Sequence, residues 1–195
     1  MTCSQVPASL GRCLMSSRRK KPFTVSIYLA CAMTGRTGKE LWDELRMLRP
    51  IYEQHGIKVI SPIEGEGIPY SDAPLPDRTD KDGTHIWKDK DKFKIREANV
   101  FVYPGLRRTS QGVMKEYMYA RGVLWRPSVG VYKPPLKAGF ITRAEDDVVC
   151  ASHQEAALTI ATRWGSKRKR LKWRLAMLNR SILKWLGYQL KELWR

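Results

Sequence analysis

The sequence lacks any apolar run approaching the ~20 residues that a helix needs to cross a bilayer, which excludes an integral membrane protein. It is also poor in metal-ligating pairs, because its four cysteines form no C-x-x-C motif and its three histidines are dispersed. We therefore expect neither a zinc site nor a disulfide framework, and predict no metal and no cofactor. This cysteine usage fits a reducing compartment and predicts a cytoplasmic protein.

Acidic residues are scarce at both ends of the chain. Residues 1–22 contain five basic and no acidic residues, and residues 163–195 contain eleven basic and one acidic. Residues 23–162 are nearly neutral, with 20 basic and 18 acidic residues, so the ends supply most of the net charge of +17. We predict a disordered basic tail (1–22), one globular domain (23–162) and a separate basic segment (163–195).

A phosphate-binding P-loop is also missing. Residues 35–40 carry a Gly-Lys pair, but the motif needs Gly where Met33 stands and Ser or Thr where Glu40 stands. ATP hydrolysis is excluded on that ground.

Short runs rich in β-branched and aromatic residues alternate with segments of helical spacing. The predicted strands are 25–30, 57–61, 99–103, 128–132 and 148–150. Capping-box patterns at Thr37 and Ser152 open two of the helices. The alternation predicts an α/β fold, a doubly wound (Rossmann/flavodoxin-like), mostly parallel sheet of about five strands. The Pro/Gly/Asp-rich segment 62–83 is typical of a mobile or functional connection, often a lid.

Two carboxylates occupy positions where apolar residues are expected. Asp91 lies on the apolar face of the helix that ends near residue 97, and Glu116 lies on the apolar face of the next helix. Their apolar neighbours are Trp87, Ile95 and Ala98 for the first helix and Val113, Tyr117 and Ala120 for the second. A core-facing carboxylate is costly unless it is paired or used. Each one alone is compatible with a structural role, but two of them flanking one strand and loop favour a site.

An anion-binding position is predicted beside these carboxylates. Ser110, Gln111 and Gly112 open the second helix, so free backbone N–H groups and the positive end of the helix dipole face the preceding loop. Arg107 and Arg108 lie just upstream. A phosphate-sized pocket next to two buried carboxylates suggests chemistry on a phosphorylated sugar.

The C-terminal segment 163–195 predicts a basic amphipathic helix. Its apolar stripe consists of Leu171, Leu175, Leu178, Ile182, Trp185, Leu186, Leu190 and Leu193. The stripe can pack on the domain or on a second copy of the chain. An anionic membrane surface and a nucleic-acid backbone are the alternative partners.

Three short segments resemble the nucleoside 2-deoxyribosyltransferase-like superfamily, which includes the 2'-deoxynucleoside 5'-phosphate N-hydrolases. IYLACAMTG at residues 27–35 resembles its first strand and loop, and Ser110-x-Gly112-x-x-x-Glu116 resembles its signature. Asp91, seven residues before Ala98, is similar in position to the catalytic aspartate of the family. The resemblance covers roughly residues 24–132.

The resemblance implies cleavage of an N-glycosidic bond through a covalent sugar intermediate. It makes Glu116 the nucleophile, and Asp91 the group that orients it and protonates the departing base. Ser110 and the Gly112 amide would hold the 5'-phosphate or 5'-hydroxyl, and Tyr28 would border the sugar.

The first loop of the matched region departs from the family pattern. The resemblance places Thr34 and Gly35 at the substrate, but Thr34 stands where some relatives carry a phosphate-binding arginine. Arg36, Arg107 or Arg108 would take over that role. Cys31 replaces the usual glycine after the first strand, and Asn99 replaces an aspartate.

Alternatives of two kinds remain open. One keeps an enzyme, either a phosphoribohydrolase or an NAD glycohydrolase. The other is a catalytically inactive nucleotide- or nucleic-acid-binding module that acts through its basic ends. The family resemblance also implies a homodimer.

Overall fold

The computed structural model describes residues 23–33, 35–76, 89–104, 111–132 and 148–193. Its sheet has five parallel strands in the order β2-β1-β3-β4-β5. The strands are β1 (Val25–Leu29), β2 (Ile57–Ile60), β3 (Val100–Pro104), β4 (Ser128–Val131) and β5 (Val148–Cys150). The chain builds outward from β1 to β2 and then returns to place β3 on the other side of β1. The predicted doubly wound α/β fold is confirmed, with its switch point between β1 and β3.

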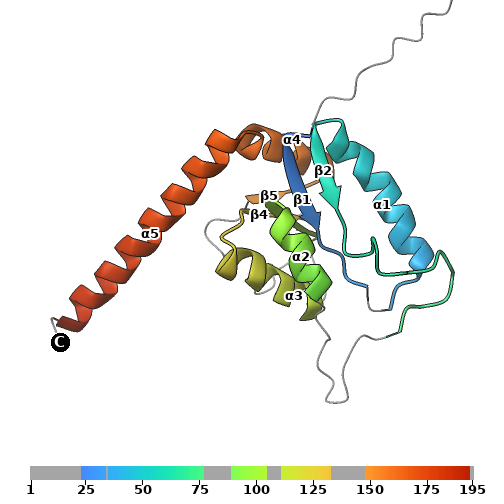
Figure 1. The fold of residues 1–195 in the computed structure, drawn as a ribbon, viewed down its shortest axis with the longest axis horizontal. Coiled ribbons are helices and arrows are strands. Elements are labelled where there is room, and N and C mark those ends of the chain that lie inside the picture. The colour runs from blue at the N-terminus through green and yellow to red at the C-terminus, as the bar shows by residue number, and fades with distance from the viewer. Residues whose placement is uncertain (1–22, 34, 77–88, 105–110, 133–147, 194–195) are drawn as a thin grey trace, which may run out of the picture.

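Helices cover both faces of this sheet (Figure 1). They are α1 (Gly38–Glu53), α2 (Asp89–Glu97), α3 (Gln111–Met118) with its π-helical extension η1 (Tyr119–Val123), α4 (His153–Trp164) and α5 (Lys167–Leu193). α1 and α4 pack on one face, while α2 and α3 pack on the other. α5 extends away from the domain.

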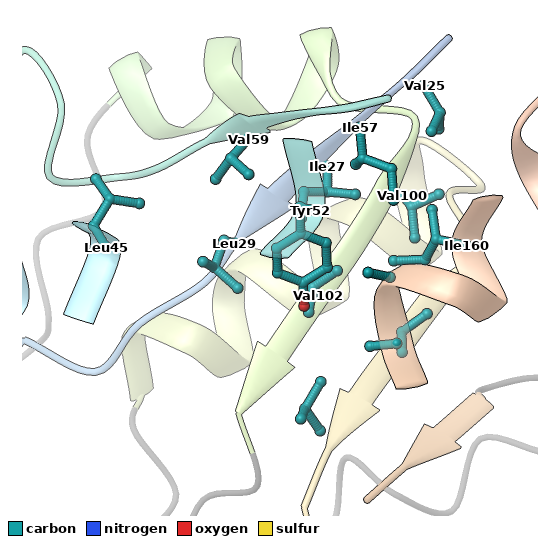
Figure 2. Close-up of a cluster of buried hydrophobic side chains, with 14 of the residues drawn as sticks. Val25, Ile27, Leu29, Leu45, Tyr52, Ile57, Val59, Val100, Val102 and Ile160 are labelled. Atoms are coloured by element: carbon teal, nitrogen blue, oxygen red, sulfur yellow. The ribbon is translucent and has the colours of Figure 1, made fainter. Parts of the chain in front are cut away.

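The core has two layers because successive residues of a strand point to opposite faces. Val25, Ile27 and Leu29 of β1 belong to the layer under α1 and α4, much of which is shown in Figure 2. Tyr28 belongs to the layer under α2 and α3. The predicted site residues on α2 and α3 therefore face the side of β1 that carries Tyr28.

The start of α1 confirms the predicted capping box. The Glu40 amide donates to Thr37 Oγ1 at 3.1 Å, and the Thr37 amide donates to Glu40 Oε2 at 2.9 Å. At α4 only half of the predicted box forms. The Glu155 amide donates to Ser152 Oγ at 3.2 Å, but the Glu155 carboxylate accepts from the Ala151 amide instead of the Ser152 amide.

The described part of the predicted lid is held against α1. The Lys39 amide donates to the Ser71 carbonyl at 3.0 Å, and the Trp42 indole donates to the Ile68 carbonyl at 3.0 Å. Leu75 closes the segment by donating its amide to the Arg36 carbonyl. Up to residue 76 this connection is therefore a fixed part of the fold, and residues 77–83 lie outside the described residues.

The boundary of the basic segment differs slightly from the predicted one. α4 continues to Trp164, whose side chain is 2% exposed and belongs to the core. The long basic helix α5 begins only at Lys167. Within the described ranges, no helix combines the length and the apolar character needed to cross a membrane.

Candidate active site

Asp91 and Glu116 are both buried on the same side of the sheet. Each is 5% exposed, although carboxylates are rarely buried unless paired or used. Ile95 and Ala98, which follow Asp91 on α2, lie in the same cluster as Val113, Tyr117 and Ala120 from α3 and η1. The predicted apolar stripes are therefore core-facing, apart from Trp87, which lies outside the described residues.

Tyr28 connects the switch point of the sheet to Glu116. Its side chain is fully buried, and its hydroxyl donates a hydrogen bond of 2.7 Å to Glu116 Oε1. Its ring stacks on Phe101 of the neighbouring strand β3, with 5.6 Å between ring centroids. The family resemblance predicts that Tyr28 borders the sugar. The structure adds a direct hydrogen bond from Tyr28 to Glu116, the predicted nucleophile. The other oxygen, Oε2, is buried and has no hydrogen-bond partner among the described residues.

Burial dominates the electrostatics of Glu116. Burial, with a smaller contribution from the negative charge of Asp91, raises the pKa of Glu116 to about 8. The hydrogen bond from Tyr28 and the positive charge of Lys94 lower the pKa but do not offset burial. Glu116 is therefore largely protonated at neutral pH.

The Tyr28 phenol remains a hydrogen-bond donor throughout. Burial raises its pKa well above the ordinary value, and the charges of Glu116 and Asp91 raise it further. This also shows that both carboxyl groups act electrostatically on one hydroxyl. Asp91, Tyr28 and Glu116 thus form one electrostatic unit drawn from α2, β1 and α3.

Lys94 and Glu66 belong to the surroundings of this unit, and sequence reasoning missed both. Only 16% of the Lys94 side chain is exposed, although lysines are mostly exposed in folded proteins. Its ammonium group donates to the Pro62 carbonyl at 2.7 Å and lies 3.7 Å from Glu66 Oε1. The Glu66 side chain is 1% exposed. The spacing of apolar residues in the sequence does not reveal the contact of Lys94 with Pro62 and Glu66, because it joins α2 to an irregular segment some thirty residues earlier.

The loop after β1 is less suited to binding phosphate than the sequence suggested. The Arg36 guanidinium is engaged by the Glu44 carboxylate. Gly35 has a φ of 75°, a left-handed conformation that glycine adopts without strain. Burial raises the pKa of the Cys31 thiol, and the nearby Glu116 charge raises it further, so this cysteine is not a reactive thiolate.

The remaining predicted binding residues divide into two groups. Gly112 is buried in the first turn of α3, one helical turn before Glu116. Thr34, Arg107, Arg108 and Ser110 lie outside the described residues. Of the residues in the anion-binding prediction, Gln111 and Gly112 at the start of α3 are described.

Metal binding finds no support in the described part of the chain. Its residues include no group of three or more His, Cys, Asp or Glu side chains that could hold an ion. The chemistry that the described side chains can perform is that of two carboxyl groups and a phenol: proton donation, proton acceptance and nucleophilic attack by a carboxylate.

Comparison with known proteins gives a likeness of fold. No protein-family model and no curated protein matches the sequence. Among solved structures, the chain is similar to a conserved protein from Enterococcus faecalis V583, at 15% identity and a TM-score of 0.44, over 71% of this chain and 98% of that one. It is also similar to the CMP N-glycosidase BcmB of Clostridium botulinum, at 13% identity and a TM-score of 0.43, over 70% of this chain and 98% of that one. At these identities and TM-scores, neither similarity identifies what this chain acts on.

Proposed function

We propose that this protein cleaves the N-glycosidic bond of a nucleoside or a nucleoside 5'-monophosphate, with water or a second base as the acceptor. The observation that carries the proposal is the burial of Asp91 and Glu116 on one face of the sheet, with Glu116 bonded to Tyr28 at the switch point. Ligands of doubly wound sheets bind at such a point. The resemblance of Ser110-x-Gly112-x-x-x-Glu116 to the deoxyribosyltransferase-like signature supports the same reaction.

The first half-reaction forms a glycosyl-enzyme intermediate. The bond between the anomeric carbon and the base nitrogen breaks, its electron pair leaves with the base, and Asp91 supplies a proton to that base. Glu116 first loses its proton to solvent and then, as a carboxylate, forms a new bond to the anomeric carbon. Tyr28 holds one carboxylate oxygen in place by its hydrogen bond, which leaves the other oxygen for attack.

The second half-reaction releases the sugar. A water molecule or another base attacks the anomeric carbon, the bond to Glu116 breaks with its electron pair, and Asp91 accepts the proton of the incoming group. The positive charge that builds on the sugar ring in both steps favours the ionised form of Glu116 over the buried neutral form. We propose that the 5'-phosphate binds at the N-terminus of α3, near the Gly112 amide.

Incubation of the purified chain with a panel of deoxynucleotides, ribonucleotides and NAD, with detection of free base, tests the proposal. We expect base release from at least one nucleoside or nucleotide. We expect Glu116→Gln and Asp91→Asn to lower its rate by roughly a hundredfold or more, the usual contribution of a nucleophile or a general acid. Glu53→Gln, at an exposed carboxylate of α1, is the matched control and should retain the rate.

A covalent adduct distinguishes this mechanism from direct hydrolysis. Acid-quenched enzyme should gain the mass of the sugar on the peptide that contains Glu116, and Glu116→Gln should gain none. Release of nicotinamide from NAD, or of base from ribonucleotides alone, would support an NAD glycohydrolase or a phosphoribohydrolase instead. Absence of base release from every substrate, with folded protein, would refute the enzymatic proposal and favour a binding module.

We also propose that the chain forms a homodimer, as the family resemblance implies. Members of that superfamily borrow a pocket residue from the neighbouring subunit. Analytical ultracentrifugation of the full chain tests this, and a monomer with full base-release activity would contradict it.

A further inference from the structure

The apolar stripe of α5 is exposed to solvent. Its described members Leu171, Leu175, Leu178 and Ile182 have the spacing of one helix face. They are 58%, 52%, 46% and 46% exposed, respectively. Single exposed apolar side chains are ordinary, but a continuous row of large ones marks a binding surface.

α5 contacts the domain through a different face. Trp173 packs against the core, and the Arg121 guanidinium lies 5.7 Å from the centroid of its ring. Trp173 and Met177 line one side of a groove of about 370 Å³, and residues of α3 and η1 line the other side. Arg170 fixes the first turn by donating to the Thr24 and Trp164 carbonyls at 3.1 and 2.9 Å. At 3.6 residues per turn, Trp173 lies nearly opposite the stripe, which is therefore turned away from the domain.

Exposed cations border the stripe on both sides. By helical position, Arg168 and Lys172 lie along one edge, and Lys167 and Arg174 lie along the other. The whole of α5 contains nine basic residues and one acidic residue, which gives it a net charge of +8. A partner for this face must accept apolar side chains at its centre and supply negative charge at both margins.

We propose that α5 binds the surface of an anionic phospholipid bilayer. The stripe would enter the boundary between headgroups and acyl chains, and the flanking Lys and Arg side chains would contact phosphate groups. A second copy of the chain fits less well, because two such stripes pressed together would bring eight net positive charges of one helix next to eight of another. A nucleic acid would neutralise the charges but leave the leucines in water.

Sedimentation of the full chain with two kinds of vesicle tests the proposal. One kind contains phosphatidylcholine alone, and the other contains equal parts of phosphatidylcholine and phosphatidylglycerol. We expect sedimentation with the anionic vesicles only, weakened by added salt because charged contacts are screened.

Two variants separate the stripe from the charge. The first combines Leu171→Gln, Leu175→Gln, Leu178→Gln and Ile182→Gln, which keeps every charge of the chain, including the five in residues 1–22. The second combines Lys167→Gln, Arg168→Gln, Lys172→Gln and Arg174→Gln, which keeps the stripe. Each should weaken binding to anionic vesicles by roughly tenfold or more, because surface binding needs both the apolar face and the charge. The control Lys58→Gln/Lys90→Gln changes exposed lysines of the domain and should bind as the wild type does.

Other outcomes would overturn the proposal. Undiminished vesicle binding by the stripe variant would mean that the leucines do not meet the lipid. A wild-type dimer that becomes a monomer in the stripe variant, with no vesicle binding by either, would identify a second copy as the occupant. Binding to a DNA or RNA duplex, but not to vesicles, would identify nucleic acid. All variants are compared by circular dichroism and base release, so a loss of fold is recognised separately.

Discussion

At the scale of single residues, the burial of Glu116 and its contact with Tyr28 set the pH response that we expect of the site. Glu116, with a pKa raised to about 8, must lose its proton to act as a nucleophile. The rate constant kcat/KM for base release should therefore increase as the pH rises through about 8. Tyr28 moderates this because its 2.7 Å hydrogen bond stabilises the carboxylate.

We predict that Tyr28→Phe moves the ascending limb of the pH profile to higher pH. A hydrogen bond to a charged group is worth about 1.5–3 kcal/mol, which corresponds to roughly one to two pKa units. The measurement is kcat/KM for base release between pH 5 and pH 10. Tyr70→Phe, at a half-exposed tyrosine that bonds to Asp43, is the control and should leave the midpoint in place. A rate that falls equally at every pH would show that Tyr28 has only a structural role.

The two buried carboxylates could be predicted from sequence because each interrupts an otherwise apolar helical stripe. Their contacts could not. The family resemblance points to Tyr28 as a residue beside the sugar, but its hydrogen bond to Glu116 joins residues 88 positions apart. Lys94 looks like a solvent-facing lysine, because its contact with Pro62 depends on the path of an irregular segment.

At the scale of elements, helix starts were the most predictable feature. The Thr37 capping box is local, and four residues of sequence contain everything it needs. The five strands were predictable for a similar reason, since each is a short apolar run bounded by turn residues. The bonds that hold residues 68–75 against the start of α1 could not be predicted, because they use backbone groups that carry no sequence signal.

We predict that Gly38→Ala destabilises the protein by about 1–3 kcal/mol, the usual cost of inserting a methyl group where no space exists. A Cβ at Gly38 would lie 1.9 Å from the Pro69 carbonyl oxygen, which is backbone and cannot rotate away. Urea denaturation measures the free energy of unfolding. Gly122→Ala is the matched control, because a Cβ there meets no atom within 4 Å, and it should be neutral or slightly stabilising. Equal stability of the two variants would contradict the close approach of α1 to residues 68–69.

At the scale of the whole molecule, the buried carboxyl of Glu116 links folding to pH. Its pKa in the folded chain, about 8, exceeds the ordinary value of 4.5 that it regains on unfolding. Between these values the folded state holds the extra proton, so the free energy of unfolding decreases as the pH rises. At about 1.4 kcal/mol per pKa unit, the full interval corresponds to roughly 5 kcal/mol.

We predict that Glu116→Gln removes this pH dependence. The free energy of unfolding of the wild type should fall from pH 5 to pH 9 relative to that of the variant, with the largest difference above pH 8. Denaturant unfolding at several pH values measures it, and the comparison cancels the titration of groups common to both proteins. Parallel curves for the two proteins would mean that Glu116 is not protonated in the folded state.

Under the proposed function, the protonated state of Glu116 would also affect how a nucleotide reaches the site. A 5'-phosphate carries negative charge, and a fully ionised pair of carboxylates would repel it during approach. Because burial keeps Glu116 largely neutral near pH 7, an incoming anion would meet less opposing charge than two carboxylates would present. Loss of the Glu116 proton to solvent would then supply the carboxylate that stabilises the sugar cation, so one side chain would first admit an anion and later attract a cation.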